Sequence, residues 1–342
     1  MKMKKLLACL VTGTMLVGLT ACGGGGGEEA ASSAASASAN GDLKEVTVVL
    51  DYVPNTNHTG LYVAQEKGYF EEQGLKVNIV EPGDNNTSAA LVAAGKGDFG
   101  VSYQEDVTYA LAAEEPMPIK AIAAIIQHNT SGFAFAKDSG IKSPKDFAGK
   151  TYAGWQAPSE EAVIQAVMKA DGADPSDITI VGADGSGVAQ FDNDIDLIWE
   201  FKGWALTQAD MDGLEYNYIP LNTLDKRLDY YTPVLITNTD LIENDPETVQ
   251  KFINAVKKGY EYAIENPDES AEILAEVAPE YDIDFLKKSQ AYLSQEYAKD
   301  AECWGLMKDE VWDGYTQFMA ENGLIEKEIP AADQYTNEFI QQ

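Results

Sequence analysis

The 342-residue sequence contains few of the residues that most often build catalytic or anion-binding sites. It has three cysteines, two histidines and a single arginine, Arg227, and no internal repeat. No P-loop, HExxH, CxxC or GxSxG motif occurs, so the usual signatures of nucleotide, zinc-protease, redox and serine-hydrolase chemistry are missing. The 24 basic residues stand against 56 acidic ones, giving a formal net charge of −32. A surface this acidic should repel nucleic acid and anionic lipid headgroups.

The N-terminal stretch predicts a lipoprotein signal peptide over residues 1–21. Three lysines precede an apolar run, Leu6–Leu19, that is too short to span a bilayer as a mature helix. The run ends in Leu-Thr-Ala-Cys, which resembles the lipobox of bacterial lipoproteins. We therefore expect Cys22 to be the lipidated first residue of the mature chain.

Residues 22–44 are expected to form a flexible tether behind that lipid. Five consecutive glycines, Gly23–Gly27, are followed by a stretch made almost entirely of Ala, Ser and Glu, which cannot bury a core. No second apolar run has membrane length. The mature protein should hang from the extracytoplasmic face of the bacterial cell membrane. The one remaining thiol, Cys303, has no partner for an internal disulfide.

The segment from Leu50 to Phe70 is the most informative part of the sequence. An apolar strand, Val46–Leu50, leads into a polar turn and then directly into a helix. In α/β folds, ligands bind at the carboxyl ends of strands beside helix N-termini. The turn therefore predicts a ligand contact through Asp51, Tyr52, Asn55, Asn57, His58 and Thr59, although His58 next to Thr59 could instead cap the helix.

The chain after the tether predicts an α/β protein with two lobes. Strands and helices alternate up to residue 219, which favours parallel sheets with helices on both faces. From Pro246 onward the pattern is almost all helical. We expect lobe I to comprise residues 45–130 and 234–342, and lobe II residues 131–233. Polar or aromatic crossings near 127–132 and 230–233 would leave a hinged cleft between the lobes, where small-molecule sites are common.

Several separated stretches resemble the solute-binding lipoproteins of ABC importers. They are GLYVAQEKGYFEEQGLKV (60–77), LVAAGKGDFGVSYQE (91–105), SGIKSPKDFAGKTYAGW (139–155) and DYYTPVLITN (229–238). With YQE and QHNTSGF, the turn DYVPNTNHTG is similar to the branch that binds thiamine-pyrimidine precursors, the ThiY-like branch. The resemblance implies a periplasmic-binding-protein type II fold and a role in transport without catalysis.

Aromatic residues and carboxylates indicate what the cleft could hold. Tyr52, Tyr103, Trp155, Trp199 and Trp204 all lie at or just after predicted strand ends, where two of them could hold a flat heteroaromatic ring. Asp51, Glu105 and Glu200 adjoin these aromatics and, with Asn55, Asn57 and Gln104, complement the amino and ring nitrogens of a 4-aminopyrimidine. No basic residue occurs in 51–59 or 102–109, which argues against nitrate and sulfonate. Two further contacts are expected from Ser131 in the first crossing and Ser159 at a helix start.

The predicted function is the capture of a formylated or hydroxymethylated aminopyrimidine for an ABC permease. The protein should act as a monomer, with no cofactor and no metal. A riboflavin-binding lipoprotein of the same fold is the alternative ligand class. The sequence is also similar, more distantly, to eukaryotic pyrimidine synthases of thiamine biosynthesis. Where that family has a lysine for pyridoxal phosphate and a reactive histidine, this chain has Ser102 and, near the second position, Asp106.

Overall fold

Two five-stranded sheets form the framework of the computed structural model, which describes residues 43–84 and 86–340. The first sheet has the order β2-β1-β3-β10-β4. Its strands are β1 (Lys44–Val49), β2 (Leu75–Val80), β3 (Phe99–Ser102), β4 (Ile119–Ala124) and β10 (Val234–Asn238). The second sheet has the order β7-β6-β8-β5-β9. Its strands are β5 (Ser131–Ala136), β6 (Thr151–Gly154), β7 (Thr179–Gly182), β8 (Leu197–Phe201) and β9 (Tyr216–Pro220).

Both sheets are mixed, so the prediction of parallel sheets was wrong. β10 runs antiparallel to β3 and β4, and β5 runs antiparallel to β8 and β9, whereas β1, β2 and β3 are parallel, as are β6, β7 and β8. The antiparallel strands are those by which the chain enters a sheet after crossing from the other one. Such a strand arrives without the helical crossover that enforces parallel pairing.

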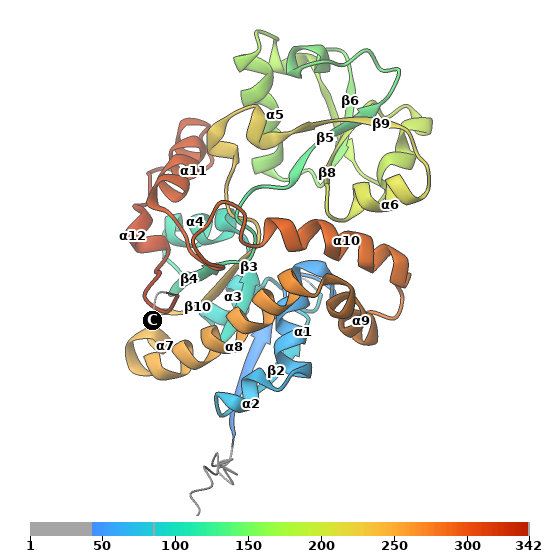
Figure 1. Ribbon diagram of the computed structural model, residues 1–342. Coiled ribbons are helices and arrows are strands. Elements are labelled where there is room, and N and C mark those ends of the chain that lie inside the picture. Colours follow the sequence, from blue (N-terminus) through green and yellow to red (C-terminus); the bar gives the residue numbers. More distant parts are fainter. Residues whose placement is uncertain (1–42, 85, 341–342) are drawn as a thin grey trace, which may run out of the picture. The chain divides into compact units, whose positions relative to one another are not determined.

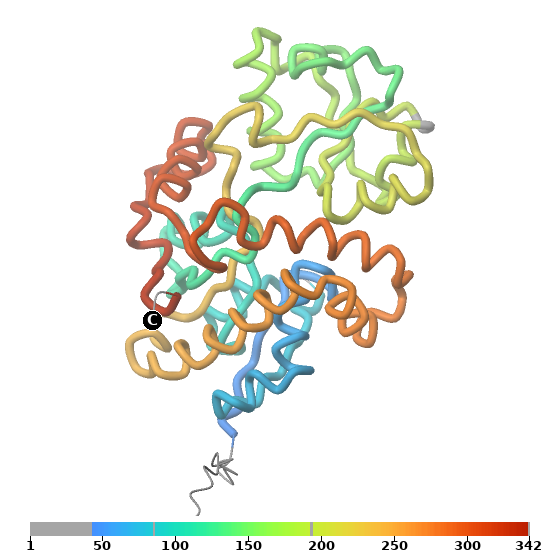
Figure 2. The backbone as a smooth tube through the Cα atoms, viewed as in Figure 1, coloured from blue at the N-terminus to red at the C-terminus, as the bar shows by residue number. Residues whose placement is uncertain are grey.

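The helices cover both sheets (Figures 1 and 2), and α8, which follows the second crossing, is the longest of those described. Those before the second crossing are α1 (Thr59–Glu66), α2 (Tyr69–Glu72), α3 (Ser88–Ala93), α4 (Gln104–Ala112), α5 (Pro158–Ala170) and α6 (Ala205–Met211). Those after it are α7 (Thr239–Asn244), α8 (Pro246–Glu265), α9 (Pro267–Val277), α10 (Ile283–Glu296), α11 (Asp309–Glu321) and α12 (Ala331–Gln334).

Two of the late helices connect the two sheet units. α10 packs against α8 and α9 on one side and contacts α6 of the second unit on the other. α11 places Trp312 in a hydrophobic cluster with Val107 and Ile236 of the first unit. The same helix places Tyr315 and Phe318 in the cluster built on the second sheet.

The chain passes between the sheets twice, from β4 to β5 and from β9 to β10. This arrangement makes the protein a two-lobed α/β fold. The proposed lobe boundaries, 45–130 with 234–342 and 131–233, remain a prediction. The predicted signal peptide and lipidated Cys22 lie outside the described residues. Within the described residues, no helix combines the length and the hydropathy of a membrane span.

Candidate ligand-binding site

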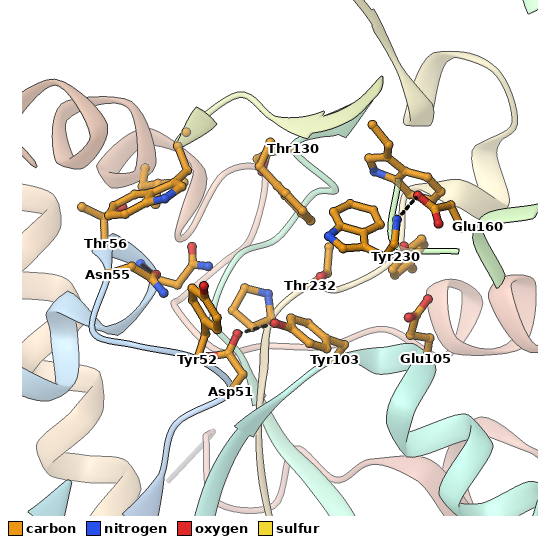
Figure 3. Close-up of a pocket in the computed structure, with 18 of the residues that line it drawn as sticks. Asp51, Tyr52, Asn55, Thr56, Tyr103, Glu105, Thr130, Glu160, Tyr230 and Thr232 are labelled. Carbon is orange, nitrogen blue, oxygen red and sulfur yellow. Dashed lines mark hydrogen bonds between the residues drawn. The ribbon is translucent and has the colours of Figure 1, made fainter. Parts of the chain in front are cut away.

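A cavity of about 540 Å³ lies among the strand ends of both sheets, the two crossing segments and α10 (Figure 3). Most of the predicted site residues line it: Asp51, Tyr52, Asn55, Asn57, Tyr103, Glu105, Trp155, Ser159, Trp199 and Trp204. The others, His58, Thr59, Gln104, Ser131 and Glu200, lie outside its wall. Its volume falls within the range of about 300–1,000 Å³ that is common for small-molecule sites.

The polar turn after β1 is held by hydrogen bonds among its own residues and by hydrogen bonds from two buried tyrosines further along the chain. The side chain of Asn55 caps a short 3₁₀ turn (Thr56–His58), because its Oδ1 accepts a hydrogen bond from the backbone N–H of Asn57 at 2.9 Å. The backbone N–H of Asn55 in turn donates to His58 Nδ1 at 3.2 Å. The hydroxyls of Tyr297 and Tyr260 donate to the carbonyls of Thr56 and Asn57. The turn therefore presents its outer side chains to the cavity in a set geometry.

Asp51 is held as a carboxylate by two side-chain donors. Because His58 Nδ1 accepts from a backbone amide, we assign its proton to Nε2, which donates to Asp51 Oδ1 at 2.5 Å. The hydroxyl of Tyr103 donates to Asp51 Oδ2 at 2.5 Å. Burial opposes the ionisation of Asp51, but these bonds outweigh it, so the pKa of Asp51 is lowered. His58 thus lies behind the site and positions Asp51.

Glu160 shapes the loop that carries Trp155. Its carboxylate accepts hydrogen bonds from the amides of Trp155 at 3.1 Å and Ala157 at 3.3 Å, and from the hydroxyl of Tyr152. A Cβ atom at position 154 would lie 1.9 Å from Glu160 Oε1, so only glycine permits this approach. The result is that Trp155 is held on the cavity wall with 59% of its surface exposed.

β8 supplies a second aromatic wall, and its alternation decides which side chains face the cavity. Trp199 and Phe201, two residues apart, both line it, while Glu200 between them points to the other face of the strand. Burial raises the pKa of Glu200 to about 7. Trp199 packs edge-to-face on Trp155 with ring centroids 5.9 Å apart, and its buried Nε1 has no hydrogen-bond partner among the described residues.

α10 joins the two lobes at the edge of the cavity. The buried Ser289 hydroxyl donates to the carbonyl of Gly203, just after β8 of the second sheet, and lies 2.6 Å from Thr56 Oγ1, in the turn after β1 of the first sheet. The next residue, Trp204, packs edge-to-face on Phe285, with centroids 4.7 Å apart. The cavity-lining residues Thr56, Gly203 and Trp204 are therefore anchored to the same helix.

Glu105 is the least satisfied carboxylate of the lining. Among the described residues, its one hydrogen-bond donor is the hydroxyl of Tyr315 on α11, which donates to Oε2 at 3.0 Å. Burial, reinforced by the nearby charge of Asp106, raises the pKa of Glu105 to about 7. Figure 3 shows its carboxylate directed toward the space between Tyr103 and Glu160.

The remaining predicted residues have structural partners. Gln104 accepts from the Tyr231 amide at 2.9 Å and donates to the Val311 carbonyl at 3.2 Å, which ties α4 to the second crossing and to α11. Ser131 donates to Asn129 Oδ1, and Thr59 donates to the Thr56 carbonyl at 3.1 Å.

Some lining residues were not among those predicted: Thr56, Thr130, Ala157, Glu160, Phe201, Gly203, Tyr230, Thr232, Pro233 and Leu293. Several of them could have been predicted from the sequence. Thr56 lies inside the polar turn, Phe201 follows the two-residue period of β8, and the second crossing was itself predicted. Leu293 had no such signal, because nothing in a helical pattern shows that α10 passes beneath the cavity.

The cavity lining combines aromatic faces with negative charge. The carboxylates Asp51, Glu105 and Glu160 line it, and no lysine, arginine or histidine of the described chain does. Over residues 43–84 and 86–340, no cluster of three or more His, Cys, Asp or Glu side chains is arranged to hold a metal ion. The arrangement suits a flat ring that offers hydrogen-bond donors at its edge.

Solved structures that share this fold include two sulfonate-binding proteins. The aliphatic sulphonate-binding protein of Escherichia coli superposes with a TM-score of 0.68 at 14% identity, over 85% of this chain and 91% of that one. The alkanesulfonate-binding protein of Xanthomonas axonopodis pv. citri, bound to MOPS, has a TM-score of 0.65 at 14% identity, over 86% and 99%. These likenesses define the class of fold, a periplasmic-binding-protein type II fold.

The chain belongs to the NMT1/THI5-like family, whose sequence profile matches residues 55–270. A formylaminopyrimidine-binding protein of Halalkalibacterium halodurans is 27% identical over 88% of this chain and 92% of its own. A 4-amino-5-hydroxymethyl-2-methylpyrimidine phosphate synthase of Legionella pneumophila is 24% identical over 86% and 92%. The predicted resemblance to the thiamine-pyrimidine branch and its synthase relatives is therefore confirmed.

Proposed function

We propose that the protein is the extracytoplasmic solute-binding lipoprotein of an ABC importer, and that it captures an aminopyrimidine precursor of thiamine. The observation that carries this proposal is the cavity, which pairs aromatic walls with carboxylate edges and has no basic residue in its described lining. A 4-aminopyrimidine offers an exocyclic amino donor to such carboxylates and flat faces to such rings. The formylaminopyrimidine-binding relative supports the same ligand class.

Tyr52 and Trp155 are the proposed stacking pair. They are the two strongly exposed aromatic residues of the lining, at 64% and 59%, and come from different lobes. A ring placed between them would bury faces that the protein alone leaves in water, and offset stacking adds about 0.5–1.5 kcal/mol per pair beyond area burial.

Catalysis by a pyrimidine synthase is the second candidate, because relatives with that name match most of the chain. The residues at the positions where the resemblance implies a lysine and a histidine argue against it. Ser102 is fully buried at the end of β3 and donates a 3.2 Å hydrogen bond to Asp106, and neither residue lines the cavity. A serine cannot form the Schiff base that a lysine forms with pyridoxal phosphate.

Titration calorimetry of the purified protein tests the proposal. We expect heat with 4-amino-5-hydroxymethyl-2-methylpyrimidine and with its formylaminomethyl analogue, and none with an alkanesulfonate. Binding of riboflavin without binding of either pyrimidine would overturn the ligand assignment. Pyrimidine formed by the protein alone from pyridoxal phosphate would favour the synthase.

The lipid anchor and the delivery to a permease are parts of the same proposal. Cys22→Ala should release the protein from the membrane fraction, while the parent protein stays there and partitions into detergent. A Cys22→Ala protein that remained with the membrane would contradict lipidation at this position.

A further inference from the structure

Three carboxylates of the described residues line the cavity, and they differ in how many hydrogen-bond donors they already have. Asp51 receives hydrogen bonds on both oxygens, from His58 and Tyr103. Glu160 also receives them on both, from a tyrosine hydroxyl and two backbone amides. Glu105 receives one, from Tyr315, on Oε2. Among the described residues, no donor hydrogen-bonds to its Oε1, and its side chain lines the cavity.

Among the described residues, no positively charged side chain interacts with Glu105. The titratable groups that interact with it come from each element packed around it: Tyr103 just before α4, Asp106 and Tyr109 on α4, Tyr315 on α11, Tyr230 in the second crossing and Glu160 on α5. All of them are acids or phenols. An ionised Glu105 is therefore opposed by both burial and its neighbours. No basic residue of the described lining balances its charge, so the balancing charge would be either a proton or a cationic ligand.

The position of Glu105 is rigid, so that this requirement is built into the site. Tyr315 stacks on Tyr230 with ring centroids 4.0 Å apart, which orients the one hydroxyl that holds Oε2. Gln104, the preceding residue, fixes the start of α4 through its bonds to Tyr231 and Val311. The free oxygen thus has a defined direction before any ligand arrives.

We infer that Glu105 selects a ligand that carries positive charge on its bound edge, and that a proton is taken up when an uncharged nitrogen base binds. The inference uses the cavity of the proposed function and rests on it for the ligand class. In the complex, the proton lies between Glu105 Oε1 and a ring nitrogen. It comes from solvent, and no other bond is made or broken. A charge-assisted hydrogen bond of this kind is about twice as strong as a neutral one.

An isosteric pair of probes tests the charge preference directly. The 4-amino-1-methylpyridinium ion is permanently charged, and p-toluidine has nearly the same shape but is neutral above pH 6. We expect the parent protein to bind the cation at least about tenfold more tightly. Glu105→Gln should abolish that preference. Glu200→Gln should retain it, because Glu200 is also buried and has a similarly raised pKa but faces away from the cavity.

Calorimetry in two buffers of different ionisation enthalpy tests the proton uptake. With 4-amino-5-hydroxymethyl-2-methylpyrimidine at pH 7.5, the parent should take up a measurable fraction of one proton and Glu105→Gln none. If the pyrimidine binds without uptake, and Glu105→Gln binds as tightly as the parent, the inference is overturned and the proposed function stands. If the pyrimidine fails to bind while the cation preference depends on Glu105, the ligand assignment falls and the inference survives. No difference between the two probes in the parent overturns the inference.

Discussion

A glycine pair beneath the candidate site gives the sharpest test of how packing supports it. Gly259 of α8 faces Gly60 of α1 at the closest approach of the two helices. A Cβ atom at position 259 would lie 2.0 Å from the Gly60 carbonyl oxygen and 3.0 Å from the Ala64 Cβ. Because the first obstacle is a backbone atom, no side-chain rotation relieves the clash, and Gly259→Ala must push α1 away from α8.

The magnitude follows from two opposing effects. Overpacking costs about 1–3 kcal/mol, and a clash with backbone lies at or above the upper end. Alanine recovers up to about 1 kcal/mol of helix propensity over glycine. We expect Gly259→Ala to lower the free energy of unfolding by about 2 kcal/mol or more. Gly314→Ala, also inside a helix, should raise it by about 0.5–1 kcal/mol, because its Cβ meets only Arg227 Cγ at 3.6 Å.

Thermal unfolding of both variants measures the difference. With an unfolding entropy of about 2.1 cal/mol/K per residue over roughly 300 residues, 1 kcal/mol corresponds to about 1.6 °C. Tm should therefore fall by about 3 °C or more in Gly259→Ala and rise by about 1 °C in Gly314→Ala. Ligand affinity should fall only in the former, because Tyr260, next to Gly259, holds the Asn57 carbonyl at 2.6 Å. Equal Tm shifts of the same sign in the two variants would refute the reasoning.

Three further predictions concern the cavity and its supports. Trp155→Ala should weaken pyrimidine binding by about tenfold to a hundredfold, with little change in Tm, and Leu214→Ala, an exposed residue of the same lobe outside the cavity, should leave both unchanged. Burial raises the pKa of Glu105 and Glu200 to about 7, so the folded state binds more protons than the unfolded state between about pH 4.5 and 7. Stability should fall as pH rises through that window, and a Tm profile that stayed flat, or that Glu200→Gln did not flatten, would contradict this linkage. Ser289→Ala should lower the free energy of unfolding by about 1–3 kcal/mol, because it leaves the buried Thr56 hydroxyl and Gly203 carbonyl without their shared partner. A urea midpoint equal to that of the parent would show that the hydroxyl does not help to join the lobes.

Most helices and strands could be predicted from periodicity and turn residues, but strand directions could not. The first crossing was predicted to extend to Gly132, and β5, which starts at Ser131, was missed. In a short segment of small residues, a glycine suggests a loop between elements more than the interior of a strand. In the structure it is a place of close approach, because a Cβ at Gly132 would lie 2.3 Å from the Ile219 carbonyl of β9. That reason exists only once β5 and β9 are paired.

The candidate site divides in the same way. Side chains at the ends of β1, β3 and β6 were predictable because strand ends and helix starts are visible in the sequence. Tyr230 was passed over although it lies in a predicted crossing, since a crossing has no periodicity to show which side chain points inward. The support of Glu105 by Tyr315 depends on α11, 210 residues further along the chain. Only the tertiary fold shows that this helix returns to the cavity.

The lining also separates into a part that is already fixed and a part that a ligand must complete. Asp51, Tyr103 and Glu105 are held by buried partners, whereas Tyr52 and Trp155 are exposed aromatic faces. We expect the fixed residues to bind the edge of the ring and the exposed aromatic residues to cover its faces. Loss of Trp155 should then lower the affinity for the cationic and the neutral probe by the same factor. Loss of the Glu105 charge should change their ratio. A double-mutant cycle of Trp155→Ala with Glu105→Gln should then show coupling below about 0.5 kcal/mol, and a larger value would mean that face and edge recognition are not separate.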